Sequence, residues 1–258
     1  MESIAEKVRQ IINDDGMLGL SRNIVAYAYR RGVRPWLPST GYVHYAGIPT
    51  AYDHKWGDDS VPSLWLPHYA MDAPDYESTL ISGLKEHVRF GDRVVVVGGG
   101  VGVTATVAAL QVGPSGSVRC FEAAIESVEK VRRTAALNGV AEWLTVDHAV
   151  VGRPISIYGT QPSREVLAPI ELPECDVLEL DCEGAEVDIL QTMSIHPRVI
   201  LVETHGHYGA PTALVSSLLE ERGYHLSCRG AAEPRVRKYC DEHDIQVVIG
   251  VLDKEQVY

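Results

Sequence analysis

The stretch VVVVGGGVGVTATVAAL, residues 94–110, decides the fold class of this chain. Its four valines predict a buried strand, and the run of small and apolar residues after position 102 predicts a helix. Between them stand Gly98, Gly99, Gly100 and Gly102. Glycine permits positive φ and lets a ligand approach the backbone closely, while a helix amino terminus offers free N–H groups. The sequence therefore predicts a ligand-binding turn where this strand meets this helix.

Strands and helices alternate on both sides of this turn. Further strands are predicted at 117–122, 144–151, 176–181 and 198–203, with two last strands near 224–228 and 246–252. Helices are predicted at 76–88, 103–111, 124–137, 186–193 and 211–222. This alternation is typical of an α/β fold in which helices cover both faces of a parallel sheet.

The first 75 residues follow no such rhythm. Helical periodicity at 2–13 and 21–32 precedes a segment rich in proline and aromatic residues, 34–74, which predicts loops and a short hairpin with GYVHYAGI as one strand. We expect an amino-terminal helical and loop extension, 1–75, and a main domain, 76–258. The aromatic rings of the extension could form a lid that stacks on a sugar, or could pack the extension itself.

Charge and composition exclude several classes of protein. The net charge of −12 disfavours a nucleic-acid partner, because phosphate binding needs a basic face. No apolar run approaches the roughly 20 residues that span a bilayer. The amino terminus, MESIAEKVRQIINDDG, lacks the apolar centre of a secretory signal. We therefore expect a cytoplasmic protein with no transmembrane segment and no nucleic-acid partner.

The spacing of the glycines discriminates between nucleotide cofactors. In the dinucleotide pattern G-x-G-x-x-G, counted from Gly98, the third glycine position is Val103, and the chain has no Gly-Lys pair for a P-loop. What is left is G-x-G-x-G, followed by Glu122 at the end of the next strand. That arrangement suits S-adenosylmethionine (SAM), because the carboxylate can accept both ribose hydroxyls. Glycines required only by tight packing of strand and helix are the alternative.

Five motifs, taken in order, resemble the FkbM family of SAM-dependent methyltransferases: VVVVGGGVG, CFEAAIESVEKVRRTAALNGV, DHAVVG, DVLELDCEGAEVDIL and RVILVETHGH. The resemblance covers about residues 76–207, and DCEGAE with its following helix is its most specific element. It implies a class I SAM-dependent methyltransferase (Rossmann-like) fold, with a seven-stranded, mostly parallel sheet whose last strand is antiparallel. It also implies O-methylation of hydroxyls on sugars or other natural products.

The resemblance also implies site residues. By this resemblance the glycines at 98, 99, 100 and 102 form the cofactor-binding turn, and Glu122 binds the ribose. Asp147 or His148 lies near the adenine, and Asp181 and Glu183 lie beside the methyl-donor end. Two positions depart from the family pattern. Val96 stands where the family has an acidic residue, and Glu179 stands where it has lysine.

Methyl transfer to a hydroxyl needs a base near the carboxyl ends of the fourth and fifth strands, where open α/β sheets bind ligands. Candidates there are Asp181, Glu183, Glu203, His205 and His207. Histidine has the pKa best matched to neutral pH, so we predict His205 as the base, with Asp181 and Glu183 beside it. Asp181 could instead cap a helix, and Asp181, Glu203 and the histidines could bind a divalent metal. We expect catalysis without a metal.

The sequence thus predicts a SAM-dependent O-methyltransferase that acts on a hydroxyl of a saccharide, glycoconjugate or related natural product. We expect a small-molecule or glycan acceptor and leave a homo-oligomer open. One alternative is a methyltransferase for a carboxylate or another small-molecule acceptor. The other is a non-catalytic SAM-fold subunit that serves binding or assembly, an alternative that Val96 and Glu179 keep open.

Overall fold

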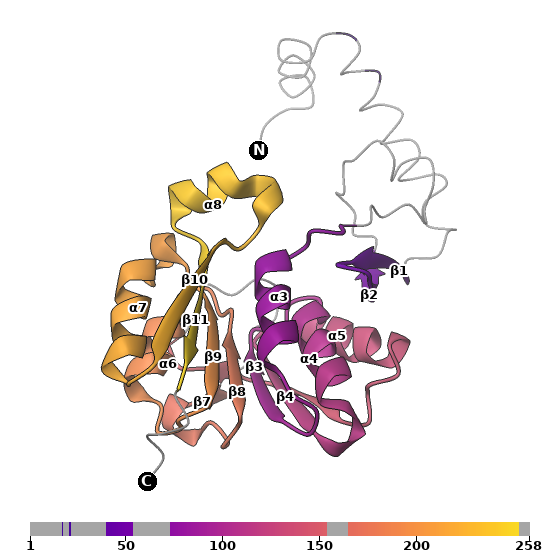
Figure 1. Cartoon of the computed structure of the whole chain (residues 1–258). Helices are drawn as coiled ribbons and strands as arrows, with labels where there is room; N and C mark the ends of the chain where they lie inside the picture. Colours follow the sequence, from indigo (N-terminus) through magenta and orange to yellow (C-terminus); the bar gives the residue numbers. More distant parts are fainter. Residues whose placement is uncertain (1–16, 18–20, 22–39, 54–72, 154–164, 253–258) are drawn as a thin grey trace. The chain divides into compact units, whose positions relative to one another are not determined.

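The computed structural model describes residues 17, 21, 40–53, 73–153 and 165–252 (Figure 1). The chain divides into two compact units, one of residues 1–42 and 52–71 and the other of residues 43–51 and 72–258. The helices predicted at 2–13 and 21–32, and most of the predicted aromatic lid, lie outside the described residues. The fold and the site below belong to the second unit.

A seven-stranded sheet forms the centre of this unit. Its strands are β3 (Arg93–Val97), β4 (Ser117–Glu122), β5 (Leu144–His148), β8 (Val177–Leu180), β9 (Val199–Glu203), β10 (His225–Ala231) and β11 (Gln246–Val251). Their order across the sheet is β10-β11-β9-β8-β3-β4-β5, and β11 runs antiparallel to both of its neighbours, while the other neighbouring pairs are parallel. This order, with its first strand in the middle and its last strand antiparallel, is the class I SAM-dependent methyltransferase (Rossmann-like) fold, as predicted.

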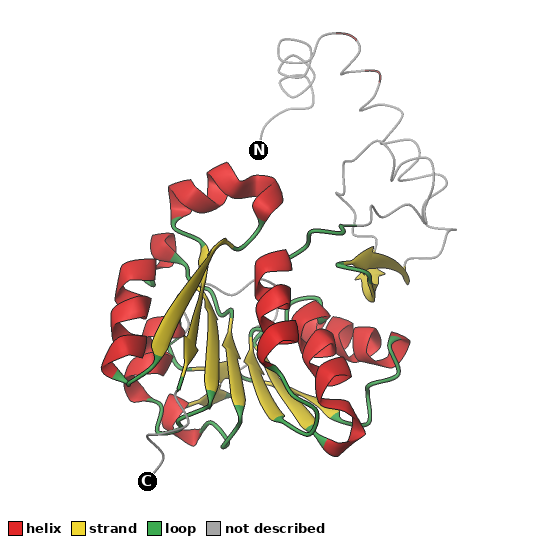
Figure 2. Ribbon diagram, viewed as in Figure 1, coloured by secondary structure: helices red, strands yellow, loops and turns green. Residues whose placement is uncertain are grey.

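Helices cover both faces of the sheet (Figures 1 and 2). The helices on one face are α3 (Ser78–His87), α4 (Val103–Val112) and α5 (Ile125–Leu137), and those on the other are α6 (Glu186–Thr192) and α7 (Thr212–Glu221). Successive residues of β3 alternate between the two cores, so that Val96 packs with the first set and Val97 with the second. A strand buried on both faces is continuously apolar, which explains the run of valines.

The segment GYVHYAGI is not one strand, contrary to the prediction. β1 (Thr40–Tyr45) ends before Ala46 and Gly47, and β2 (Ile48–Asp53) returns beside it. Ala46 and Gly47 have φ of 49° and 79°, as the two-residue turn of a hairpin requires. The predicted short hairpin is present, but its turn lies inside the predicted strand.

The connection between the last two strands is also more regular than predicted. We predicted no helix in this connection, but its residues fold into the helix α8 (Arg237–His243). Ion pairs one turn apart join Arg237 to Asp241 at 3.5 Å and Lys238 to Glu242 at 3.7 Å. Cys240 is the buried residue of this helix, so the sequence carries no apolar stripe that would reveal it.

The third predicted strand, 144–151, divides in two. β5 ends at His148, and β6 (Val150–Val151) pairs instead with β7 (Val166–Leu167) outside the main sheet. In the part of the chain that the structure describes, no helix combines the length and the apolar character that crossing a membrane requires.

Candidate active site

The glycines of the turn after β3 have two different roles. Some are required by close packing, and one leaves the backbone open to a ligand. Gly98 has φ of 96°, and a Cβ there would collide with the backbone oxygen of Asp181. A Cβ on Gly102 would stand 2.8 Å from the Cα of Val131. A Cβ on Gly100, which has φ of 52°, would meet no atom within 4 Å and would face open space. Gly98 and Gly102 are therefore required by packing, and Gly100 is the glycine that a ligand can approach.

Glu122, at the end of β4, holds this turn in place. Its Oε2 accepts hydrogen bonds from the N–H groups of Gly99 and Gly100, both at 2.9 Å. Its Oε1 accepts one from the N–H of Ala124 at 2.8 Å. A carboxylate oxygen accepts about two hydrogen bonds, so Oε1 keeps capacity for one more donor. Glu122 can therefore fix the turn and still bind one ligand hydroxyl through Oε1, which is less than the two predicted.

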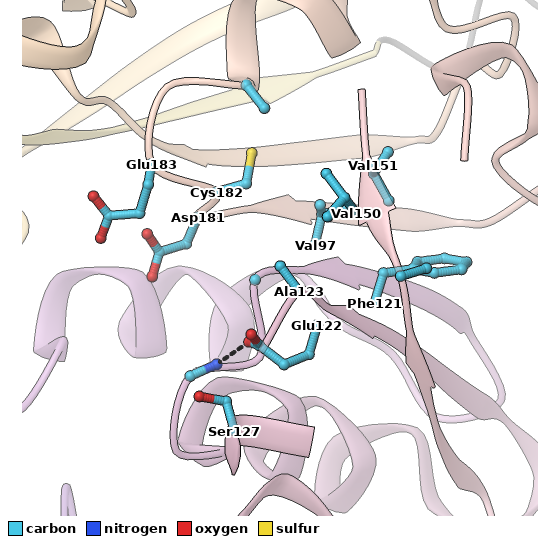
Figure 3. Close-up of a pocket in the computed structure, with 14 residues that line it drawn as sticks. Val97, Phe121, Glu122, Ala123, Ser127, Val150, Val151, Asp181, Cys182 and Glu183 are labelled. Atoms are coloured by element: carbon cyan, nitrogen blue, oxygen red, sulfur yellow. Dashed lines mark hydrogen bonds between the residues drawn. The ribbon is translucent and has the colours of Figure 1, made fainter. Parts of the chain in front are cut away.

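A cleft opens at the carboxyl ends of β3, β4 and β8, where the strand order reverses and open α/β sheets bind ligands. Its empty volume is about 720 Å³, including space open to solvent. Its lining consists of Val97, Gly98, Gly100, Phe121, Glu122, Ala123, Ser127, Ala149, Val150, Val151, Asp181, Cys182, Glu183 and Ala185. Figure 3 shows Asp181 and Glu183 in the loop after β8, with Glu122 and Ser127 across from them. None of these lining residues is Lys or Arg.

The structure brings together five of the predicted site residues in this lining: Gly98, Gly100, Glu122, Asp181 and Glu183. Sequence reasoning missed the apolar wall of Phe121, Val150 and Val151 and the hydroxyl of Ser127. The available signal was the position of Ser127 in the first turn of the helix that follows the strand ending at Glu122. Nothing in the sequence marked the valines, because they read as ordinary strand residues.

Asp147 and His148 do not line the cleft. The Oδ2 of Asp147 pairs with the Nε of Arg119 at 2.7 Å. The Nε2 of His148 lies 3.1 Å from the backbone oxygen of Ala123. The residues that follow them line the cleft instead. A role for Asp147 or His148 near adenine stays a prediction.

Carboxyl groups surround the buried imidazole of His205, and we call Asp181, Glu183, Glu186, Glu203 and His205 the His205 cluster. The Nε2 of His205 lies 3.6 Å from Asp181 Oδ1, 3.9 Å from Glu183 Oε2 and 3.8 Å from Glu203 Oε1. Its Nδ1 lies 2.8 Å from Glu186 Oε1. The cluster joins the ends of β8 and β9 to the first turn of α6, because Glu186 begins that helix.

His207, also considered as a base, does not belong to this cluster. It is exposed, and its ring centroid lies 6.2 Å from that of His205. It contacts Tyr208 instead, at a centroid distance of 3.9 Å. The histidine that faces the carboxylates is therefore His205.

The pKa values of the cluster are unusual. Burial raises the pKa of Asp181 to about 6 and that of Glu183 to about 7, although the nearby His205 opposes both shifts. Burial alone would lower the pKa of His205, but the hydrogen bond with Glu186 and the charge of Asp181 outweigh it and raise that pKa to about 9. An imidazole with this pKa is protonated at neutral pH and cannot accept a proton. The balance favours Glu183 over His205 as a base.

Two further carboxyl groups interact electrostatically with Asp181 of this cluster. Glu179 is fully buried in β8, and burial followed by the charge of Asp181 raises its pKa well above the ordinary value. Glu77 precedes α3, and burial with the charge of Asp181 raises its pKa to about 8. Burial therefore disfavours the charged form of Glu179, the residue that stands in the position of the family's lysine.

Comparison with known proteins gives no family assignment. No family model matches the chain, and no curated protein matches it. The resemblance to the FkbM family therefore stays a prediction.

Several solved structures are similar to this chain at low identity. One is a SAM-dependent O-methyltransferase from Thermotoga maritima, with 17% identity, 75% of this chain and 70% of that chain covered, and a TM-score of 0.45. Another is the O-methyltransferase TomG from Streptomyces achromogenes, with 13% identity, 72% of this chain and 83% of that chain covered, and a TM-score of 0.43. A third is a ribosomal protein L11 methylase from Lactobacillus delbrueckii subsp. bulgaricus, with 14% identity, 72% of this chain and 81% of that chain covered, and a TM-score of 0.47. The fold assignment rests on the strand order of the sheet.

Proposed function

We propose that the protein is a SAM-dependent methyltransferase that transfers a methyl group to a hydroxyl oxygen. The observation that carries the proposal is the cleft at the reversal of strand order, bounded by the open Gly100 on one side and by Asp181 and Glu183 on the other. None of the lining residues is Lys or Arg, so the cleft suits a cationic ligand. SAM is such a ligand, because its sulfonium carries a positive charge.

The residues present fit SAM in four respects. The backbone at Gly100 is accessible, and Glu122 Oε1 can accept a hydrogen bond from a ribose hydroxyl. Phe121 and Val151 offer apolar surface for a purine ring, and Asp181 places a carboxylate for the cationic end. When bound, SAM supplies an electrophilic methyl group. Alignment of donor and acceptor in the cleft then provides the main rate enhancement.

Glu183 is the residue that we propose as the base for the hydroxyl proton. Its side chain is 26% exposed, compared with 4% for His205, so an acceptor can reach it. Its pKa of about 7 suits proton transfer near neutral pH. Its backbone φ of 54° lies in the left-handed region, which a non-glycine residue occupies at a cost and which is common at functional sites. In this proposal His205 and Asp181 lie beside Glu183, and their charges influence its pKa and its position.

The acceptor class follows from the resemblance to the FkbM family, and we propose a hydroxyl of a saccharide, a glycoconjugate or a related natural product. Cells with and without the gene should differ in the mass of one such compound by a single methyl group. A difference confined to a carboxylate ester would instead favour the alternative acceptor class.

Binding of SAM tests the proposal most directly. Gly100→Asp adds a side chain and a negative charge to the open side of the cleft, at a positive φ that aspartate tolerates. We expect calorimetric titration to show SAM bound by the parent and at least about tenfold weaker binding by Gly100→Asp. Gly139→Asp is the matched control, since Gly139 has φ of 69° and also faces open space, but after α5. A parent that binds neither SAM nor its demethylated product would refute the proposed function.

A further inference from the structure

The Nε2 atom of His205 faces an unusual set of neighbours. Three carboxylate oxygens surround it at 3.6, 3.8 and 3.9 Å, and His205 is only 4% exposed. These separations exceed the roughly 2.7 to 3.2 Å of an N–H···O hydrogen bond. A bare lone pair on Nε2 would face three negative oxygens, and an Nε2–H would bond none of them well. The arrangement therefore has room for a cation between the four atoms.

The spacing of these atoms suits coordination of one ion. Metal–ligand distances for nitrogen and oxygen are about 2.1 Å, which places two ligand atoms about 3.0 to 3.4 Å apart at angles of 90 to 109° and about 4.2 Å apart when they are opposite. The ligand atoms of Asp181, Glu203 and His205 all lie within 4.8 Å of one another. Shifts of a few tenths of an ångström in these side chains would bring all three ligand atoms within coordinating distance of one ion.

Glu186 prepares His205 for this role from the other side of the ring. Glu186 is fully buried, and its Oε1 accepts hydrogen bonds from His205 Nδ1–H at 2.8 Å and from the N–H of Cys182 at 3.1 Å. A carboxylate that accepts the Nδ1 proton fixes the tautomer and leaves the Nε2 lone pair for a metal, as in carboxylate–histidine–metal triads. The bond is independent of the three oxygens that face Nε2.

The shortage of basic partners for these carboxyl groups supplies a further reason for a cation. Among the described residues, Asp181, Glu183 and Glu203 form ion pairs with His205 and with no Lys or Arg. The Oε2 of Glu203 is buried and has no hydrogen-bond partner within the described ranges. Several carboxylates around one imidazole thus form a site that a divalent ion would neutralise better than one proton.

We propose that Asp181, Glu203 and His205 bind one divalent transition-metal ion of the Mn²⁺ type, with Glu183 beside it and Glu186 as a positioning residue. Imidazole favours first-row transition ions over Mg²⁺ and Ca²⁺, while two carboxylates favour Mn²⁺ over softer ions. This proposal departs from our expectation of catalysis without a metal, which stays a prediction. An ion here, at the edge of the cleft, could bind an acceptor hydroxyl and lower its pKa.

Mn²⁺ binding to the full-length, metal-free protein tests the proposal. Electron paramagnetic resonance reports free Mn²⁺, and calorimetry gives the stoichiometry. We expect one Mn²⁺ per chain, at least about tenfold weaker binding in Asp181→Asn, Glu203→Gln and His205→Ala, and about 10- to 100-fold weaker binding in Glu186→Gln. His225→Ala is the control, because His225 is exposed and pairs with Val251 at the other edge of the sheet. It should bind Mn²⁺ like the parent.

The outcomes separate this inference from the proposed function. No Mn²⁺ binding by a folded parent, or equal binding by the parent and both Glu203→Gln and His205→Ala, overturns the metal site. Circular dichroism shows which variants are folded, and the near-isosteric Glu203→Gln carries the test if His205→Ala does not fold. SAM binding without Mn²⁺ binding refutes the metal site alone. Mn²⁺ binding without SAM binding supports the metal site and refutes the proposed function.

Discussion

A substitution of one loop residue, Glu183, should impair proton removal and leave cofactor binding nearly unchanged. Glu183→Gln keeps the size and hydrogen-bonding reach of the side chain but cannot accept a proton. We expect turnover to fall by about 10² to 10⁴-fold, the usual range for loss of a general base, with SAM affinity within about threefold of the parent. Single-turnover kinetics and calorimetry measure the two quantities. Glu174→Gln, an exposed carboxylate before β8, is the control and should match the parent.

The contrary result would restore the role that the sequence suggested for His205. If Glu183→Gln keeps nearly parental turnover while His205→Ala loses it with both SAM affinity and Mn²⁺ affinity intact, the imidazole acts as the base. Its pKa in the active complex would then have to lie far below the value of about 9 found in the free protein.

Glu122 should contribute to stability as well as to binding. Its carboxylate accepts three backbone N–H groups, from Gly99, Gly100 and Ala124. Glu122→Ala leaves these donors without their acceptor, so we expect a loss of about 1.5 to 3 kcal/mol in the free energy of unfolding, together with weaker SAM binding. Urea unfolding and calorimetry measure the two effects. Weaker SAM binding at unchanged stability would mean that the carboxylate serves only the ligand.

The glycine turn, as an element, predicts opposite outcomes for neighbouring positions. Gly98→Ala would drive a Cβ into the backbone of Asp181, so we expect a loss of at least about 3 kcal/mol from backbone strain and displaced packing together. Gly100→Ala has open space and should lose only about 1 to 2 kcal/mol, from its positive φ. Urea unfolding compares them. Equal losses would show that the crowding around Gly98 relaxes.

Elements with strong periodicity were predictable, and those without it were not. The strand Ser117–Glu122 was predicted at its observed bounds, because apolar residues and a turn on each side define it. The helix Arg237–His243 was missed because ion pairs rather than an apolar stripe stabilise its surface. The break at Ala46 was missed because alanine rarely adopts positive φ, and the hairpin geometry imposes it.

The candidate site, too, was predictable only in part. Since parallel strands end at one edge of a sheet, sequence order alone suggested that Asp181, Glu183, Glu203 and His205 would meet, and the structure brings them together. Burial could not be read from the sequence. It raises the pKa of Glu179, and it encloses His205 with the carboxyl groups that raise the pKa of the imidazole.

For the whole molecule, the carboxyl groups with raised pKa predict an unusual dependence of stability on pH. The pKa of Glu77 rises from 4.5 to about 8 on folding, so the folded state holds this proton more tightly than the unfolded state. Its stabilising effect is complete below about pH 4.5 and is lost as the pH rises through 8. The shifts of Glu183 and His205 act in the same direction. Stability of the metal-free protein should therefore fall between pH 5 and pH 8.5.

Thermal unfolding in the presence of a chelator checks this dependence. One pKa unit corresponds to about 1.4 kcal/mol, and about 1 kcal/mol moves the Tm of a chain of this size by about 2 to 4 °C. We expect a fall of at least about 4 °C between pH 5 and pH 8.5. Glu77→Gln should flatten the profile, whereas Glu221→Gln, exposed on α7, should not. A Tm that rises over this range would contradict the raised pKa values.

The insertion of β11 between β9 and β10 has a consequence for synthesis of the chain. β9 pairs on one side with β8, made shortly before it, but on the other side only with β11, the last strand of the sheet to leave the ribosome. Until then the nascent protein carries β9 with an unpaired edge, Val199–Glu203, which ends in a residue of the His205 cluster. An open apolar edge invites pairing with another chain. Chaperone dependence and aggregation of this protein should therefore concentrate in the interval before β11 emerges.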